Sequence, residues 1–170
     1  DGDRVLHVDP NGEFVLLAMQ RTMFDYPSVW RFPLDGTAEK SGKQVQAQRY
    51  YVWNWFVDDT GVVRMAIETL DSGNLKVLYR RSADEDFRTV GVINRVNKDK
   101  RGDWSFARLK AGSDDGWVLE KDESGHYVVK KVNFATLSSS ETVFAKPGFD
   151  IDEVWFDDQQ QLVAAFWSDD

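Results

Sequence analysis

The sequence contains no cysteine and only two histidines among its 170 residues. Without cysteine, the chain can form neither a disulfide framework nor a thiolate-ligated metal site, and it has no cysteine nucleophile. His7 and His126 are therefore the only side chains that could supply an imidazole base for catalysis. The absence of cysteine does not decide the cellular compartment, because secreted proteins can also lack disulfides.

Long apolar runs and an excess of positive charge are also missing. No apolar stretch approaches the roughly 20 residues that a membrane-spanning helix needs. The first residues, DGDRVLHVDP, lack the charged-then-apolar pattern of a signal peptide and begin inside a strand pattern, as a fragment would. The 29 acidic and 21 basic residues give a net charge of −8, whose field repels phosphate groups. We therefore expect neither a membrane nor a nucleic acid as a partner.

Apolar and aromatic residues, in contrast, are plentiful. They make up 42% and 14% of the chain, which places it among folded proteins, and the length suits a single domain over residues 1–170. The apolar residues alternate with polar ones or occur in bursts of about four to eight that are rich in Val, Phe, Tyr and Trp. Helical spacing is hard to find. The pattern predicts an all-β fold.

Two stretches of the chain are alike. LHVDPNGEFVLLA (6–18) and WFVDDTGVVRMA (55–66) share an aspartate, then a glycine, then an apolar run. Comparable aspartates occur at Asp9, Asp58, Asp114 and Asp157, which are spaced 49, 56 and 43 residues apart. A drifting period of this size is typical of repeats built from small antiparallel sheets, whose strands are retained while their loops vary.

Each repeat contains strand patterns separated by Asp-Gly, Ser-Gly or Thr-Gly pairs, which suit hairpin turns. Four-stranded units at this period are typical of β-propeller blades. The expected blades span residues 4–46, 52–94 and 104–146, with an incomplete fourth at 152–170. Such a partial set cannot close a ring, because propellers typically have about four to eight blades. We therefore expect a segment of a larger, seven-bladed ring, or a chain that dimerises to cover its open faces.

Three stretches resemble a known family. DGDRVLHVDP with EFVLLAMQ, YPSVWRFPLDG (26–36) and YVWNWFVDDTGVVRMAI (51–67) are similar to the N-terminal propeller of bacterial serine peptidases of the prolyl oligopeptidase family, the dipeptidyl and acylaminoacyl peptidases among them. The resemblance implies a propeller that caps an α/β-hydrolase domain of the same parent chain and limits entry to short peptides. It implies a bacterial cytoplasmic or periplasmic location without deciding between them.

The hydrolase half of that family is not visible in this sequence. A G-x-S-x-G motif followed by Asp and His would announce it, and the chain contains no such motif. No catalytic residue is therefore carried over from the family. The resemblance implies a non-catalytic segment whose partners are the hydrolase domain and, in the parent protein, the peptide substrate.

A catalytic site within the chain itself is disfavoured by the surroundings of its histidines. His126 lies near Asp122 and Ser124 in KDESGHY, but the composition of this stretch is explained by a hairpin turn. His7 lies within an alternating strand, where a packed or solvated side chain is expected.

Carboxylate pairs are the next candidates for chemistry. A glycosidase needs two carboxylates across one bond, and calcium needs several oxygens converging on one point. The pairs should instead lie apart around one rim and cap turns, because they recur at equivalent turns of successive units. They are Asp58 with Asp59, Asp114 with Asp115, and Asp157 with Asp158. The segment DIDE (150–153) could bind calcium weakly, but it lacks the glycine and glutamate spacing of an EF-hand loop, and we expect no dedicated metal or cofactor site.

Two features remain as possible contact sites. The run NRVNKDKRGDW (94–104) is the longest charged connection, and functional loops are often longer than a fold requires. Trp53 and Trp55 share a face if the strand alternates regularly, and we expect this pair to be exposed if any tryptophan pair is. The possible contact residues are Trp53, Trp55, Arg95, Lys98, Lys100 and Arg101.

These features leave an alternative function open. The chain could be a stand-alone β-propeller-like module that binds a protein or carbohydrate partner through its aromatic residues and the 94–104 loop. A propeller glycosidase is a third hypothesis, which would need convergent carboxylates.

Overall fold

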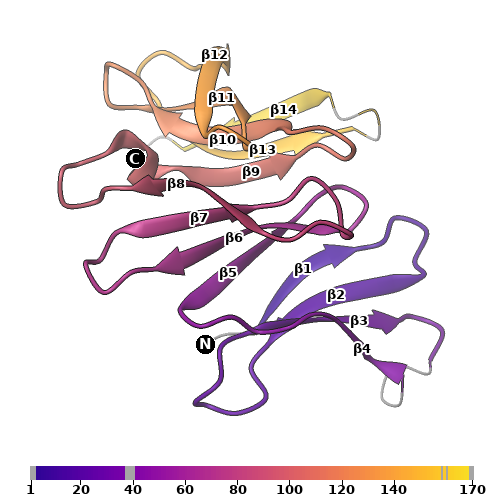
Figure 1. Cartoon of the computed structure of the whole chain (residues 1–170). Coiled ribbons are helices and arrows are strands. Elements are labelled where there is room, and N and C mark those ends of the chain that lie inside the picture. Colours follow the sequence, from indigo (N-terminus) through magenta and orange to yellow (C-terminus); the bar gives the residue numbers. More distant parts are fainter. Residues whose placement is uncertain (1–2, 37–40, 158, 160, 169–170) are drawn as a thin grey trace.

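The computed structural model describes residues 3–36, 41–157, 159 and 161–168 (Figure 1). Fourteen strands and one short 3₁₀ helix, η1 (Lys100–Asp103), are assigned in this part of the chain. The all-β prediction is confirmed. The described part contains no helix of the length and apolarity that crossing a membrane would require.

The strands form four antiparallel sheets, each from consecutive segments of chain. Sheet 1 contains β1 (Arg4–Val8), β2 (Phe14–Met19), β3 (Ser28–Pro33) and β4 (Lys43–Gln46). Sheet 2 contains β5 (Val52–Val57), β6 (Val63–Thr69), β7 (Leu75–Tyr79) and β8 (Arg88–Ile93). Sheet 3 contains β9 (Ser105–Leu109), β10 (Asp115–Lys121), β11 (Tyr127–Asn133) and β12 (Ser138–Phe144). Sheet 4 contains β13 (Ile151–Phe156) and β14 (Leu162–Trp167).

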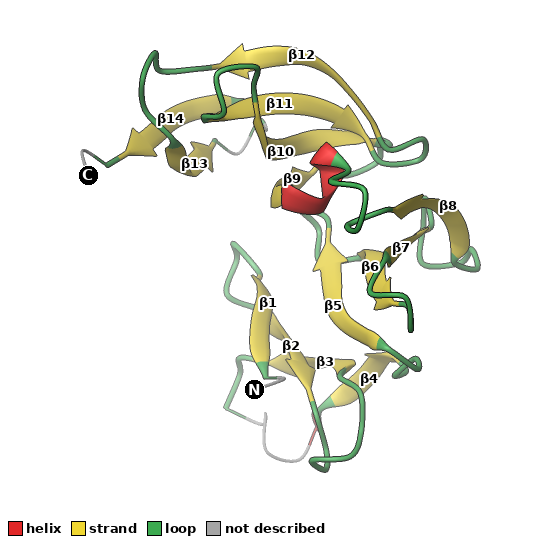
Figure 2. Cartoon of the chain, turned by 90° about the vertical axis from the view of Figure 1, so that its left-hand side faces the viewer, coloured by secondary structure: helices red, strands yellow, loops and turns green. Residues whose placement is uncertain are grey.

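Within each sheet the spatial order follows the chain order, so every connection inside a sheet joins neighbouring strands. Figure 2 shows the sheets fanned around an opening, with the first strands β1, β5 and β9 nearest to it and β12 farthest out. The repeated Asp and Gly residues produce this simple order, because a short turn lets the next strand pair directly with the one before it. Gly61, with φ of +77°, takes the left-handed conformation that such a turn needs.

The core lies between the sheets. One apolar cluster joins sheets 1 and 2 around Val29 and Trp55, and a second joins sheets 2 and 3 around Tyr79 and Phe134. A third, smaller cluster joins sheets 3 and 4 around Ile151. Each sheet therefore buries apolar faces against its neighbours, as expected for small sheets that are too thin to hold a core alone.

The outer faces of the two end sheets remain partly uncovered. Large apolar side chains are exposed on β1 and on sheet 4, namely Val5, Val8, Trp155, Val163, Phe166 and Trp167. Among the described residues, no further sheet covers these side chains. These faces have the composition of surfaces that pack against further protein.

The fan has two edges, which we name by their connections. The turn edge carries the turns after β1, β5, β9 and β13, and the connection edge carries the links between sheets together with the β2–β3, β6–β7 and β10–β11 turns. In Figure 1 the turn edge is on the right and the connection edge is on the left. The candidate sites described below are located by these two edges.

The structure contradicts the expected pairing of Trp53 and Trp55 on one face. Val52 pairs with Glu68 and Asn54 pairs with Ile67, so Trp53 is an extra residue in a β-bulge. The bulge interrupts the alternation of side chains. Trp53 is 44% exposed, whereas Trp55 is 2% exposed and lies in the core. Trp55 is therefore not available as a contact residue.

Candidate functional site

A cleft of about 690 Å³ runs along the innermost strands β1, β5 and β9. Its walls combine apolar side chains such as Val5 and Phe106 with polar ones such as His7, Asn54 and Ser105. Each of these strands pairs with a neighbour on one side only, so its other edge faces away from its own sheet. The cleft therefore combines a volume suited to a ligand with backbone groups that are not used in a sheet.

The cleft narrows at the turn edge and is bridged near the connection edge. At the turn edge, the end of β5 and the end of β9 meet in a parallel bridge between Asp58 and Leu109. An ion pair between Arg108 and Asp59 reinforces this contact. Near the connection edge, Arg4 Nη1 donates to Asn54 Oδ1 at 2.8 Å and joins β1 to β5.

Three buried polar atoms of the cleft walls have no hydrogen-bond partner in the described part of the chain. They belong to His7 (Nε2), Asp59 (Oδ2) and Trp104 (Nε1). His7 packs against the ring of Phe14, with centroids 5.6 Å apart. No serine hydroxyl among the described residues bonds to either histidine, so the described part of the chain shows no pre-formed serine–histidine pair.

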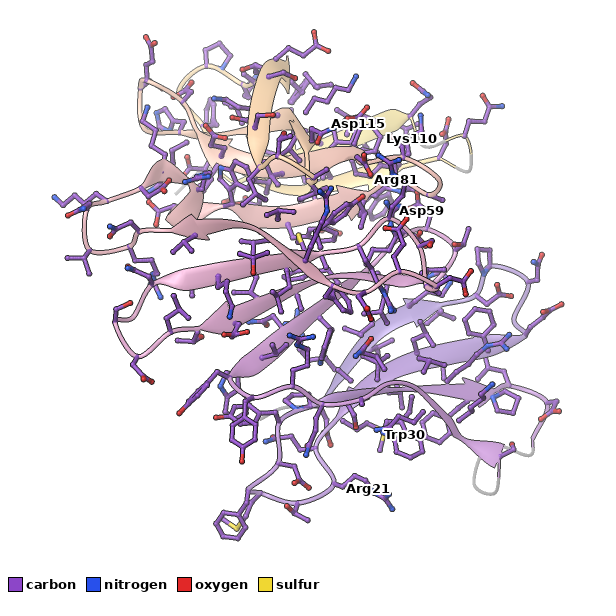
Figure 3. All side chains as sticks on the ribbon, viewed as in Figure 1. Arg21, Trp30, Asp59, Arg81, Lys110 and Asp115 are labelled. Carbon is purple, nitrogen blue, oxygen red and sulfur yellow. The ribbon has the colours of Figure 1, made fainter. Side chains whose placement is uncertain are left out.

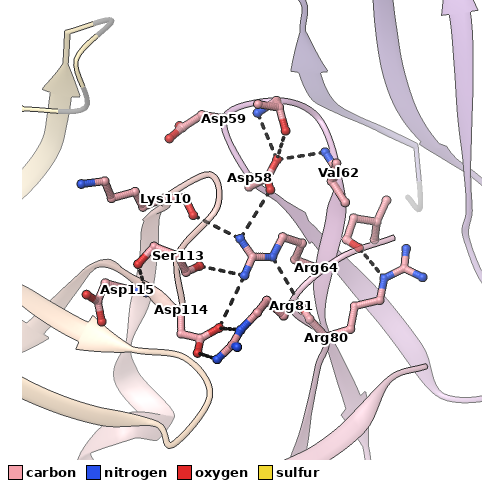
Figure 4. A network of polar contacts seen from close by, with 12 residues as sticks. Asp58, Asp59, Val62, Arg64, Arg80, Arg81, Lys110, Ser113, Asp114 and Asp115 are labelled. Carbon is pink, nitrogen blue, oxygen red and sulfur yellow. Dashed lines mark hydrogen bonds and ion pairs between the residues drawn. The ribbon is translucent and has the colours of Figure 1, made fainter. Parts of the chain in front are cut away.

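The densest polar network lies at the turn edge between sheets 2 and 3 (Figure 4). Its centre is Arg64 on β6, which is 1% exposed. The guanidinium donates to the backbone carbonyls of Lys110 at 3.1 Å and Ser113 at 2.7 Å, and to the hydroxyl of Tyr79. It also forms ion pairs with Asp58 at 3.5 Å and Asp114 at 3.8 Å. Arg64 thus joins a strand of sheet 2 to a turn of sheet 3.

This network corrects the expectation that the acidic turns lie apart. Asp58 and Asp114 belong to different sheets but converge on Arg64, because the sheets pack with their turn edges side by side. Figure 3 shows Asp59, Arg81, Lys110 and Asp115 gathered at the same edge. The convergence still gives no glycosidase site, since the two carboxylates are neutralised by arginines.

The electrostatics of the network keep its ionic state fixed. The hydrogen bond and charge of Arg81 hold the pKa of Asp114 below its usual value, and the hydroxyl of Tyr79 contributes to the same effect. Burial and the hydrogen bond to Asp114 raise the pKa of Tyr79 above its usual value. Asp114 is therefore charged and Tyr79 neutral across the physiological range. Neither is placed to exchange a proton near neutral pH.

The acidic turn residues divide into two roles. Asp58 caps its turn as predicted, because its Oδ1 accepts from the backbone N–H groups of Thr60 and Val62. Asp157 caps its turn through the N–H of Gln161. The second role, ion pairing, was not predicted: Asp59 and Asp114 form ion pairs, and Asp58 combines both roles through its ion pair with Arg64. Asp115 accepts from Asn133, and Asp158 lies outside the described residues.

The charged loop at 94–104 lies at the connection edge and contains the helix η1. Asp99 caps η1 and binds the guanidinium of Arg101 through both carboxylate oxygens. This hydrogen bonding lowers the pKa of Asp99 to about 2. Arg101 also borders a cavity of about 100 Å³ between sheets 2 and 3. Arg101 therefore has a structural role in the loop, and its expected surface contact stays a prediction.

The other basic residues of this loop keep the contact role open. Arg95, Lys98 and Lys100 have no ion pair among the described residues. Lys98 has φ of +55°, a left-handed conformation that is uncommon for lysine. Together with Trp53 and Arg101, they place five of the six candidate contact residues at the connection edge.

The hairpin around His126 behaves as the turn that its composition predicted. Asp122 Oδ1 accepts from the N–H of Ser124 at 2.8 Å and from its hydroxyl at 2.6 Å. The imidazole Nδ1 of His126 lies 3.2 Å from Asp150 instead. The serine and the histidine thus bind different carboxylates, and no nucleophile–base pair forms.

The carboxylates of DIDE are also separated by their partners. Asp150 accepts from the N–H of Tyr127, Asp152 from the hydroxyl of Ser168, and Glu153 from the indole of Trp155. The described residues contain no group of three or more acidic or histidine side chains arranged to hold a metal ion.

Comparison with known proteins identified no matching family model, no matching curated protein and no matching solved structure.

Proposed function

We propose that this chain is a segment of a β-propeller that borders the entry path of oligopeptides to a separate α/β-hydrolase domain, in a serine peptidase of the prolyl oligopeptidase type. The observation that carries the proposal is the cleft along β1, β5 and β9. In a propeller, the first strand of each blade lines the central channel, so the position of this cleft supports an entry path.

The arrangement of the sheets supports the propeller part of the proposal. Three consecutive four-stranded sheets and a two-stranded one share apolar clusters with their neighbours, and their first strands lie on one side. The uncovered faces of sheets 1 and 4 are where further blades would pack.

The peptidase part rests on the resemblance of YPSVWRFPLDG (26–36) and YVWNWFVDDTGVVRMAI (51–67) to that family. The chemistry of the cleft agrees with a gate. A passing peptide meets mixed polar and apolar walls, and no described side chain is arranged to attack it. The reaction itself would be carried out by the hydrolase domain.

The test is made on the natural protein that carries this chain. Ser105 is exposed on the wall of the cleft, so Ser105→Trp narrows the path. We expect kcat/KM for oligopeptides to fall about tenfold, equivalent to about 1.4 kcal/mol, while hydrolysis of a small chromogenic ester is unchanged. Ser72→Trp, in the exposed β6–β7 turn, is the matched control and leaves both rates unchanged.

Two outcomes contradict the proposal. The natural protein could hydrolyse neither esters nor peptides, in which case no peptidase is gated. Alternatively, the isolated chain could itself turn over these substrates after rigorous purification, which would place the chemistry inside the segment.

A further inference from the structure

Four aromatic rings gather at the connection edge between sheets 1 and 2, and we name this group the aromatic patch: Tyr26, Tyr50, Tyr51 and Trp53. Tyr26 is central, with its ring centroid 5.7 Å from those of Tyr50 and Tyr51 and 5.0 Å from that of Trp53. The contributing segments are the β2–β3 turn, the link between β4 and β5, and the start of β5, which lie together at the lower left of Figure 1.

The core does not require these rings. Val52 and Trp55 on the same strand fill the cluster between sheets 1 and 2, and Trp55 donates its indole N–H to the carbonyl of Pro27. Tyr50, in contrast, is 80% exposed. Phe24, in the same turn as Tyr26, is 87% exposed. A contiguous exposed group of large aromatic residues is typical of an interaction surface.

Two backbone irregularities hold the patch in its outward position. Tyr51 has φ of +62°, a left-handed conformation that a bulky side chain rarely adopts. Trp53 is the extra residue of the bulge in β5, and without that bulge regular alternation would change the direction of its side chain. Both irregularities affect residues of the patch. They are independent observations that the chain maintains this surface at the expense of regular structure.

The polar atoms of the patch are one indole N–H, which only donates, and three hydroxyls, which can donate or accept. The indoles of Trp30, Trp55 and Trp155 all donate to protein oxygens. Among the described residues, the indole of Trp53 and the hydroxyls of the three tyrosines have no such partner. The nearest acid in the same turn, Asp25, already accepts from Thr22. The patch therefore offers apolar rings and free N–H and O–H groups, with no free carboxylate among its four residues.

We propose that the aromatic patch binds a proline-rich peptide segment in the polyproline II conformation. Such a segment has no internal hydrogen bonds, so its carbonyls accept from outside donors, and its pyrrolidine rings pack against aromatic side chains. The indole N–H of Trp53 and the hydroxyls of the three tyrosines can donate to the carbonyls of a chain whose prolines lack N–H groups.

Two other ligands fit this geometry less well. A sugar stacks on an open ring face, whereas Trp53 and Tyr26 meet edge to face and Tyr26 is tilted against Tyr50 and Tyr51. A quaternary ammonium cation needs a space enclosed by rings, and these rings contact one another. We therefore favour a peptide over a carbohydrate as the ligand of the aromatic patch. The site uses no residue that lines the cleft of the proposed gate.

The experiment titrates the full chain, labelled with nitrogen-15, with an oligoproline peptide. A glycine–serine peptide of equal length and a linear glucan oligosaccharide serve as comparison ligands. We expect oligoproline to shift the indole N–H signal of Trp53, and the other two ligands to leave it in place. Trp53→Phe retains a ring but removes the donor, so affinity falls about fivefold.

Two further variants make the result specific. Trp155→Phe makes the same change at an exposed tryptophan of sheet 4 and leaves the affinity unaltered. Tyr50→Phe removes a hydroxyl at a highly exposed position and lowers the affinity without a change in the amide spectrum. The proposal is overturned if oligoproline causes no shift, if Trp53→Phe and Trp155→Phe behave alike, or if only the oligosaccharide binds.

Discussion

At the scale of single residues, the buried guanidinium of Arg64 is the contact on which the junction of sheets 2 and 3 most depends. Removing one partner of a buried ion pair leaves the other charge without compensation, which costs about 3–5 kcal/mol. We therefore expect Arg64→Ala to lower the free energy of unfolding by about this amount in urea denaturation, because Asp58 and two carbonyls lose their donor.

The matched control for this prediction is Arg81→Ala. Arg81 also binds Asp114, but its side chain is 64% exposed, and solvent screening leaves exposed pairs with little effect on stability, so a much smaller loss is expected. Equal losses for the two variants would show that burial does not determine the strength of these contacts.

The sequence contained only part of the information on this junction. The turn-capping role of Asp58 was predictable, because the backbone N–H groups that donate to its carboxylate belong to Thr60 and Val62, within four residues of it. The convergence with Asp114 was not, since it depends on how neighbouring sheets pack. One signal was present: Arg64 lies inside the apolar run VVRMAI, and a charge in a buried strand requires a partner.

At the scale of elements, the order of strands was predictable and their irregularities were not. Alternation predicted strand patterns for all four sheets. It could not predict the bulge at Trp53, because a one-residue insertion leaves the pattern of apolar letters almost unchanged. The sequence did not predict the conformation of the 94–104 loop either. The ion pair between its residues Asp99 and Arg101 forms only in the folded conformation.

The pairing of Asp99 with Arg101 makes the stability of this loop dependent on acid. A carboxyl whose pKa in the folded state is about 2, below the ordinary 3.8, stabilises the fold above pH 3.8 and loses this effect as pH falls toward 2. Allowing for solvent screening, we expect a loss of about 1 kcal/mol over this range. When the pH falls from 5 to 2, the free energy of unfolding of Asp99→Asn should therefore decrease by about 1 kcal/mol less than that of the wild type. Denaturation curves recorded over this pH range measure the difference. Identical acid profiles for the two proteins would contradict the assignment.

At the scale of the whole molecule, the fan of sheets presents apolar faces at both ends. Sheet 4 exposes the ring pair of Trp155 and Phe166, whose centroids lie 4.9 Å apart, and sheet 1 exposes Val5 and Val8. In isolation these faces can be covered only by another molecule, so we expect the chain to dimerise with rising concentration, as two half rings would. Light scattering over a wide range of concentrations measures this.

Phe166→Lys places a charge on the end face and should shift the equilibrium toward monomer, whereas Val96→Lys, at an exposed valine of the 94–104 loop, should not. A wild-type chain that stays monomeric at high concentration would mean that the end faces are stable in water, so their apolar residues would no longer indicate that further blades pack there.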